Sequence, residues 1–334
     1  MQKNCNFASS IHKKIKAMEN KRLKLPAGIQ TFEKLRKKNC VYVDKTKYLV
    51  DIIDNVDVCF LARPRRFGKS LTVSTFDALF SGKKVLFKGL YAEEFLNRPD
   101  FEPSPVIRLS MDGVQTDEGI DGIKDSIKRK TLMAAKVLDV EVDKTASAGD
   151  ILAELIVNTS QKYNQKVVFL LDEYDKPYTD FFNEPDMAKA VRKMLRGYYA
   201  QIKANDEYLK FTFITGTSKL LKIEVDSALN HLCNISYDNE YGNICGLTKE
   251  EIIDTFSDFL EETKLTIDNL VEKMKKNRNC FCLENDMKHL LFNSFNDDRK
   301  LLCDSFCHDI DEKYLTFSPC SVFDFFDDLC GDGD

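Results

Sequence analysis

The feature that most constrains this fold is a strand that runs into a tight loop and then into a helix, over residues 58–70. Val58–Ala62 is an apolar run of the length of a buried strand. It is followed by a short Arg-rich loop and then by Gly68-Lys69-Ser70, which opens a helical segment. The first N–H groups of a helix have no partner within it, and the helix dipole favours negative charge at that end. This arrangement indicates a binding site for phosphate groups.

The spacing approximates the P-loop pattern G-x-x-x-x-G-K-[ST], in which the Lys faces the β- and γ-phosphates and the hydroxyl binds Mg²⁺. Lys69 and Ser70 take these two positions, whereas Arg63 stands where the pattern has its first Gly. Taken alone, the motif leaves an ordinary surface loop as an alternative. The residues expected to surround the phosphates are Arg63, Arg65, Arg66, Phe67, Gly68, Lys69, Ser70 and Leu71. The three Arg fit phosphates or a neighbouring carboxylate equally well, so we expect at least one to be structural.

A second motif favours the nucleotide interpretation over the alternatives. Val167–Leu171 is an unbroken apolar run, typical of a strand buried on both faces of a parallel sheet, and it ends in Asp172 and Glu173. Open α/β sheets bind their ligands at the carboxyl ends of their strands. We therefore expect Asp172 to hold Mg²⁺ and Glu173 to orient or polarise the attacking water. Lys69, at the phosphates, is the other catalytic residue expected from the two motifs. A core strand followed by an acidic turn is the alternative for this motif alone.

Strand and helix patterns alternate through the first two thirds of the chain, which predicts an α/β fold with a doubly wound parallel sheet. Thr215 ends the last apolar strand, which we expect between the strands of the two motifs. Its hydroxyl there either contacts the γ-phosphate or water, as a catalytic sensor, or satisfies the strand end. The expected strands are 56–62, 105–110, 167–171 and 211–215, and the expected helices are 69–80, 120–137, 150–163 and 185–203.

Composition limits the classes of partner. The chain has 334 residues and a net charge of −5, so no global field draws it to nucleic acid. Eleven Cys without regular spacing, and no secretory segment, favour reduced thiols in the cytoplasm. No apolar run approaches the length of a membrane span. We expect no membrane partner.

Several stretches, in this order, resemble one family. They are Gly28–Leu35, Tyr42–Thr46, Arg63–Ser70, Asp172–Pro177, Thr215–Lys219 and Gly246–Glu251. The chain resembles the AAA-ATPase-like family, P-loop ATPases often joined to a C-terminal PD-(D/E)XK nuclease-like domain. The resemblance implies an AAA-like P-loop fold with ATP and Mg²⁺ as ligands, and it accounts for Arg63, because this family normally has Arg at that position. ATP rather than GTP rests on the family alone.

The resemblance runs from about Gly28 to Leu329, and we expect no nuclease-like domain in this chain. It implies an ATPase core (28–245) followed by a smaller helical lid-like domain (246–323), and the change to helical patterns from Leu247 indicates the same boundary. Composition indicates a basic N-terminal arm (1–27) and an acidic tail (324–334). Two positions depart from the family. Asn234 replaces an expected Asp, and Phe306–Asp309 lacks the Tyr-rich lid motif. The polar stretch Asp238–Asn243 has few apolar positions, so we expect a hinge there.

These patterns predict a Mg²⁺-dependent ATPase that positions water for in-line attack on the γ-phosphate. Two alternatives stay open. The intact Glu173 favours the enzyme, whereas the altered lid favours a nucleotide-dependent switch or scaffold with little turnover. An ATPase component of a nucleic-acid-processing system is the other alternative, although no sequence motif encodes base recognition. A protein partner or a homo-oligomer also remains open.

Overall fold

The computed structural model describes residues 23–26, 28–181, 183–217, 232–263, 266–276, 280–282 and 315–317. Several expectations fall outside these residues. They are most of the basic arm, the end of the Thr215–Lys219 motif, the Phe306–Asp309 departure and the acidic tail.

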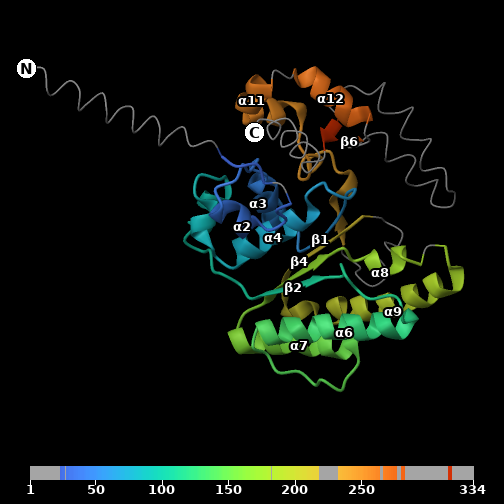
Figure 1. Cartoon of the computed structure of the whole chain (residues 1–334). Coiled ribbons are helices and arrows are strands. Elements are labelled where there is room, and N and C mark those ends of the chain that lie inside the picture. Colours follow the sequence, from blue (N-terminus) through green and yellow to red (C-terminus); the bar gives the residue numbers. More distant parts are fainter. Residues whose placement is uncertain are drawn as a thin grey trace, which may run out of the picture.

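A five-stranded, all-parallel sheet forms the centre of the structure, which is a mixed α/β fold consistent with a P-loop protein (Figure 1). The spatial order is β2-β3-β4-β1-β5. The expected position of β4, between the strands of the two motifs, is therefore confirmed. Because all strands run the same way, the ends of β1, β2, β3 and β4 meet at one edge. The strands are β1 (Val58–Ala62), β2 (Val106–Ser110), β3 (Val167–Asp172), β4 (Leu209–Gly216) and β5 (Cys233–Asn234).

Helices cover both faces of the sheet, as the apolar run of β3 predicts. Val167, Phe169 and Leu171 pack into the core formed with α6 (Gly119–Val137), α7 (Ala148–Tyr163) and α9 (Pro185–Ala204). Val168 and Leu170 pack into the opposite core, with α3 (Thr46–Asn55) and α4 (Lys69–Phe80). Every side chain of β3 is buried, so a strand with alternating polarity could not occupy this position.

The helices match their predicted ranges within a few residues, and α4 matches at both ends. The sequence did not predict the small elements around α4. Phe32, Leu79 and Phe87 form a third apolar core there, and this core also includes Val50 of α3. The remaining small elements are α2 (Phe32–Lys37), η1 (Lys84–Phe87), α5 (Ala92–Leu96), α8 (Lys176–Thr179), η2 (Asp206–Tyr208) and η3 (Ile235–Tyr237).

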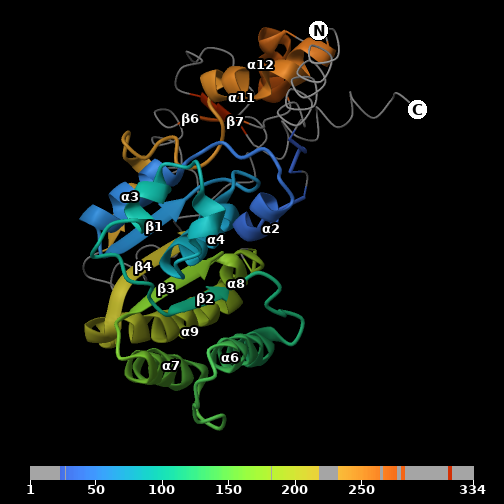
Figure 2. The ribbon, with the colours of Figure 1, turned by 90° about the vertical axis from the view of Figure 1, so that its left-hand side faces the viewer.

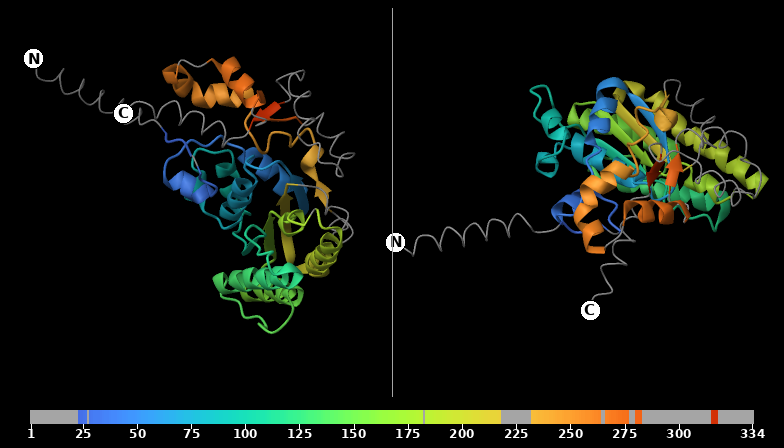
Figure 3. Two further views of the ribbon diagram at one scale, coloured as in Figure 1. Left: turned by 45° about the vertical axis from the view of Figure 1, so that its right-hand side comes forward. Right: turned by 90° about the horizontal axis from the view of Figure 1, so that it is seen from above.

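After the sheet, the chain forms α11 (Lys249–Thr263) and α12 (Ile267–Lys276). Figures 2 and 3 show both helices on the side of α3 and α4, away from α6 and α7. The structure adds an antiparallel pair, β6 (Cys280–Cys282) with β7 (Leu315–Phe317), which the sequence analysis did not expect. A helical lid-like domain over 246–323 stays a prediction. No helix in the described residues is long and apolar enough to cross a membrane.

The reason for expecting a hinge at Asp238–Asn243 is wrong, because this stretch is anchored to the core. The hinge itself stays a prediction. Tyr241 is buried, and its hydroxyl donates a hydrogen bond to the Asp51 carboxylate on α3. Ile244 and Cys245 pack into the core beneath α4. These contacts were not predicted, because the stretch contains few apolar residues.

Candidate functional site

The loop between β1 and α4 has the geometry of a phosphate cradle. Gly68 precedes α4 with a φ of 96°, a left-handed conformation that L side chains rarely adopt. No side chain caps the helix, so the first N–H groups of α4, from Lys69 to Leu71, are left for an acceptor outside it. Glycine at position 68 therefore turns the chain so that the helix can begin directly at the loop.

Lys69 is held at the start of α4 and is 5% exposed. Its Nζ donates a hydrogen bond to the carbonyl of Pro64, at 3.0 Å. Burial lowers the pKa of Lys69, and the nearby carboxylates of Asp172 and Glu173 offset this only partly. An anion in front of Lys69 would supply the missing compensation, because a buried cation is stabilised by a close opposite charge.

Asp172 ends β3 and faces the start of α4. Its side chain is 4% exposed and accepts a hydrogen bond from Ser70, yet its Oδ1 atom has no hydrogen-bond partner in the described part of the chain. Burial raises the pKa of Asp172, while Ser70 and Lys69 lower it. A buried carboxylate oxygen without a partner is costly, so this atom marks a position suited to a cation.

Glu173 follows with a φ of 52°, an uncommon conformation for a residue with a side chain. It is half-buried and lies beside Asp172 in the same cavity. Burial raises the pKa of Glu173 most, and the negative charges of Asp112 and Asp172 raise it further. A carboxylate with a raised pKa, facing a cavity, is suited to accept a proton or to polarise water.

A single cavity of about 420 Å³ joins these groups. Its polar lining includes Lys69, Ser70, Asp172 and Glu173, together with the exposed Arg65 and Arg66. Its apolar lining includes the side chains of Ile29, Val41, Val43, Leu49, Ile244 and Leu247. A ligand that fills the cavity would combine a strongly anionic part with a flat or apolar part.

Lys45 lies in this cavity and connects it to α11. It is 8% exposed and forms an ion pair with Glu251. Glu251 also accepts a hydrogen bond from the Thr248 amide at 2.9 Å, and the Thr248 hydroxyl accepts one from the Glu251 amide at 3.2 Å. These two hydrogen bonds form a capping box at the start of α11. Asp44 does not line the cavity. Its carboxylate accepts hydrogen bonds from Thr46 and Tyr91 instead.

Two of the predicted site residues are not brought to the cavity. Arg63 is 1% exposed and its guanidinium donates to carbonyls of the 236–242 segment. It is thus the structural Arg of the three. Thr215 is fully buried, and its hydroxyl donates to the carbonyl of Leu61 at 2.8 Å. This hydrogen bond is the one expected of a hydroxyl that satisfies the strand end. The predicted residues that line the cavity are Arg65, Arg66, Phe67, Gly68, Lys69, Ser70, Leu71, Asp172 and Glu173.

Two contributions to the cavity were not predicted from the sequence, that of β2 and that of the segment before α11. Ser110 pairs in register with Asp172 and lines the cavity with Arg108 and Asp112. The signal was present, because residues 105–110 were expected as a parallel strand whose end lies at the ligand edge. The amide of Gly246 donates to the carbonyl of Phe67, at 3.0 Å, and fastens the later segment to the loop.

A family model described as "Predicted AAA-ATPase" matches residues 26–226, more than half of the chain. The chain belongs to this AAA-ATPase-like family. It is also similar to an uncharacterized protein in the vnfD 5′ region of Azotobacter chroococcum mcd 1. The two are 36% identical over 240 residues, which are 71% of this chain and 45% of that protein. The chain thus spans less than half the length of this relative. No solved structure matches this chain.

Proposed function

We propose that this AAA-ATPase-like chain binds ATP with Mg²⁺ in the 420 Å³ cavity and hydrolyses the γ-phosphate. One observation carries the proposal. The unpartnered Oδ1 atom of Asp172 lies in the same cavity as Lys69 and Ser70, at the open start of α4. A cation site next to an anion site is the combination that a metal-bound triphosphate requires.

The donor set fits Mg²⁺. The ion prefers oxygen ligands and is commonly held by one or two carboxylates together with substrate phosphates. Ser70 and Asp172 would hold it here, consistent with the lack of any larger cluster of His, Cys, Asp or Glu suited to a metal in the described residues. When bound, Mg²⁺ supplies positive charge that neutralises the phosphate oxygens.

The remaining roles, phosphate binding and the polarisation of water, fall to groups of the chain itself. The amides at the start of α4 and the ammonium of Lys69 bind the β- and γ-phosphates. Arg65 and Arg66, which line the cavity and are exposed, add positive charge without being buried. Glu173 orients and polarises the attacking water, and its raised pKa makes it a better proton acceptor than an ordinary carboxylate.

The apolar side chains that line the cavity are the proposed contacts of the base. Ile29 and Val43 line the cavity from the N-terminal segment, while Ile244 and Leu247 line it from the segment before α11. An aromatic base packs well between aliphatic side chains, which bind it through area rather than through a donor pattern. Family membership favours adenine as that base.

A phosphate-release assay tests the proposal. With ATP and Mg²⁺ the protein should release phosphate above a protein-free blank, and EDTA should abolish the release. A fluorescent ATP analogue should bind in the presence of Mg²⁺. If the analogue does not bind the full chain with or without Mg²⁺, the proposal is wrong.

A second candidate is a nucleotide-dependent switch that binds ATP but hydrolyses it slowly. The observation in its favour is Thr215, whose hydroxyl is committed to the Leu61 carbonyl and so leaves no sensor hydroxyl from β4 at the cavity. Tight binding of the analogue with negligible phosphate release would support this candidate over the enzyme.

A further inference from the structure

A second hollow lies beside the nucleotide cavity, between α2 and α4. This basic groove has a volume of about 500 Å³ and is lined by the cations Lys34, Lys37, Lys38, Lys83 and Arg108. Among the residues that the structure describes, two carboxylates, of Glu33 and Asp77, lie between them. A chain of net charge −5 thus gathers an excess of positive charge in one concave place.

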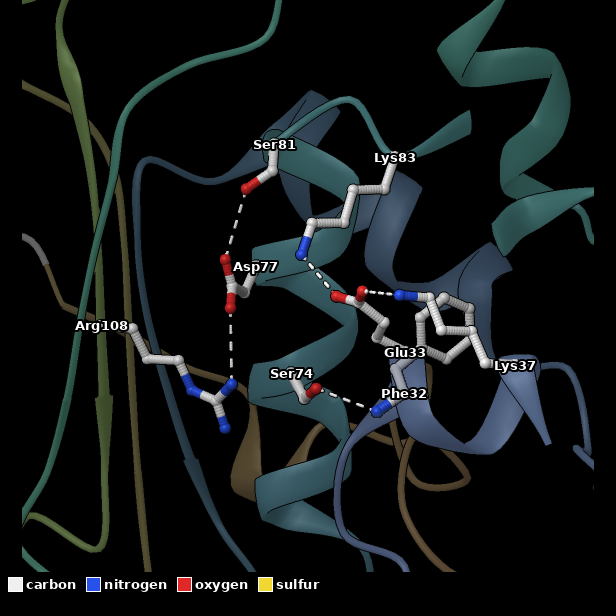
Figure 4. Close-up of polar contacts among 8 residues, drawn as sticks. All are labelled: Phe32, Glu33, Lys37, Ser74, Asp77, Ser81, Lys83 and Arg108. Atoms are coloured by element: carbon white, nitrogen blue, oxygen red, sulfur yellow. Dashed lines mark hydrogen bonds and ion pairs between the residues drawn. The ribbon is translucent and has the colours of Figure 1, made fainter. Parts of the chain in front are cut away.

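The two carboxylates form ion pairs that hold three of the cations in place, and the groove keeps a net positive charge. Figure 4 shows Glu33 between Lys37 and Lys83, and each Nζ lies 2.6 Å from a Glu33 oxygen. The hydrogen bonds from Lys37 and Lys83 lower the pKa of Glu33 to about 2, so its carboxylate stays ionised. Arg108 extends towards Asp77 on α4, at 3.4 Å (Figure 4).

Lys34 and Lys38 are the cations left for an outside ligand. Both side chains are exposed, and neither has an ion-pair partner in the described part of the chain. They follow one another by four positions, which places them on one side of the chain around α2. Two unpaired ammonium groups on a groove whose other cations are pre-positioned form a surface for a ligand with several regularly spaced negative charges.

We propose that the basic groove binds the phosphate backbone of a single nucleic-acid strand. Lys and Arg contacts to phosphates give affinity and position without reading sequence. An anionic membrane is the competing partner, but a surface that binds one carries an apolar face next to its cations. Ala78 is the sole hydrophobic side chain that lines the groove among the described residues, and the groove is concave. Both features favour the strand.

The groove and the nucleotide cavity share a wall. Thr31 and Arg108 line both hollows. A strand in the groove would therefore lie next to the proposed ATP site, although its binding needs no nucleotide.

The test measures fluorescence anisotropy of a short, labelled, single-stranded DNA of mixed sequence, with the full chain, over a series of KCl concentrations. Lys34→Ala combined with Lys38→Ala should weaken binding several-fold at low salt. It should also reduce the slope of log K against log [salt] by about 1.4, since each contact to a single strand contributes about 0.7. Glu33→Gln should tighten binding, because it removes a negative charge and releases Lys37 and Lys83.

The matched control is Lys136→Ala combined with Lys144→Ala, which removes the same charge from exposed positions at and after the end of α6. It should leave the affinity for DNA close to that of the wild type. The fluorescent ATP analogue is titrated against all variants, so a lost groove is distinguished from a lost nucleotide site.

Four results would overturn the proposal. The oligonucleotide does not bind while the ATP analogue does, or both double variants weaken binding equally. Binding is abolished by Lys69→Ala, which would place the DNA in the nucleotide cavity. Finally, the protein binds phosphatidylserine vesicles through Lys34 and Lys38 but not the oligonucleotide, which would make the groove a membrane contact.

Discussion

Arg63 stands at the first glycine position of the P-loop pattern, and its replacement by Met separates a structural role from a phosphate-binding one. Its Nη1 donates to the carbonyls of Ala62 and Ser236, at 3.0 and 2.8 Å, and its Nη2 to those of Tyr241 and Gly242, at 3.1 and 3.3 Å. Methionine keeps much of the apolar stem but donates no hydrogen bond. A buried acceptor that loses its donor costs about 1–3 kcal/mol. Because some of these carbonyls retain other partners, we expect Arg63→Met to lower the free energy of unfolding by about 4 kcal/mol.

Urea unfolding followed by circular dichroism measures this loss, and the melting temperature should fall by roughly 10 °C. Arg65→Met is the matched control on the same loop, since Arg65 is exposed and lines the cavity. It should change stability by no more than about 0.5 kcal/mol while it weakens ATP binding. If Arg63→Met unfolds at the wild-type urea concentration and loses affinity for ATP instead, then Arg63 serves the phosphates and the structural argument fails.

Three further predictions concern the cavity. Lys69→Ala should weaken binding of a fluorescent ATP analogue, whereas Lys47→Ala, an exposed control outside the cavity, should not; equal affinities would refute the P-loop assignment. Glu173→Gln should keep ATP bound and slow phosphate release, and an unchanged rate would make Glu173 a bystander. Because Glu173 must be ionised and burial raises its pKa in the nucleotide-free protein, kcat/KM for ATP, which reports the free protein, should fall with decreasing pH at a value above the ordinary range of Glu. Asp112→Asn should shift this fall to lower pH, because it removes a negative charge that raises the pKa of Glu173. If the fall stays at the same pH, it reports the titration of another group.

The parts of the fold that the sequence predicted are those whose signal is local. The unbroken apolar run of β3 specified a strand covered on both faces, and the start of α4 followed from the glycine before Lys69. Asp172 and Glu173 lie at the end of the predicted strand and line the cavity, because a position at a strand end follows from the local pattern. Local composition is enough for such features.

The features that the sequence missed depend on partners far along the chain. Nothing near Arg63 indicates that its acceptors lie in the 236–242 segment, and a hydroxyl at the end of a strand, as in Thr215, can satisfy the neighbouring strand or face a ligand. The strand β5 has two residues, and β6 and β7 have three each, too short for any periodicity to show. Pairing across such distances decides these elements, and composition does not encode it.

The link between Lys45 and Glu251 leads to a last prediction, about α11. Glu251 caps the start of this helix and also pairs with Lys45 inside the cavity. A triphosphate that fills the cavity adds negative charge near Lys45. This charge competes with Glu251 for Lys45 and so affects the residue that caps the helix. ATP with Mg²⁺ should therefore protect the amides of α11 together with those of residues 63–72 in hydrogen exchange. Glu251→Gln keeps an acceptor for the cap but removes the charge, so it should leave protection of the loop and abolish that of α11. Protection confined to residues 63–72 in the wild type would mean that α11 does not respond to the nucleotide.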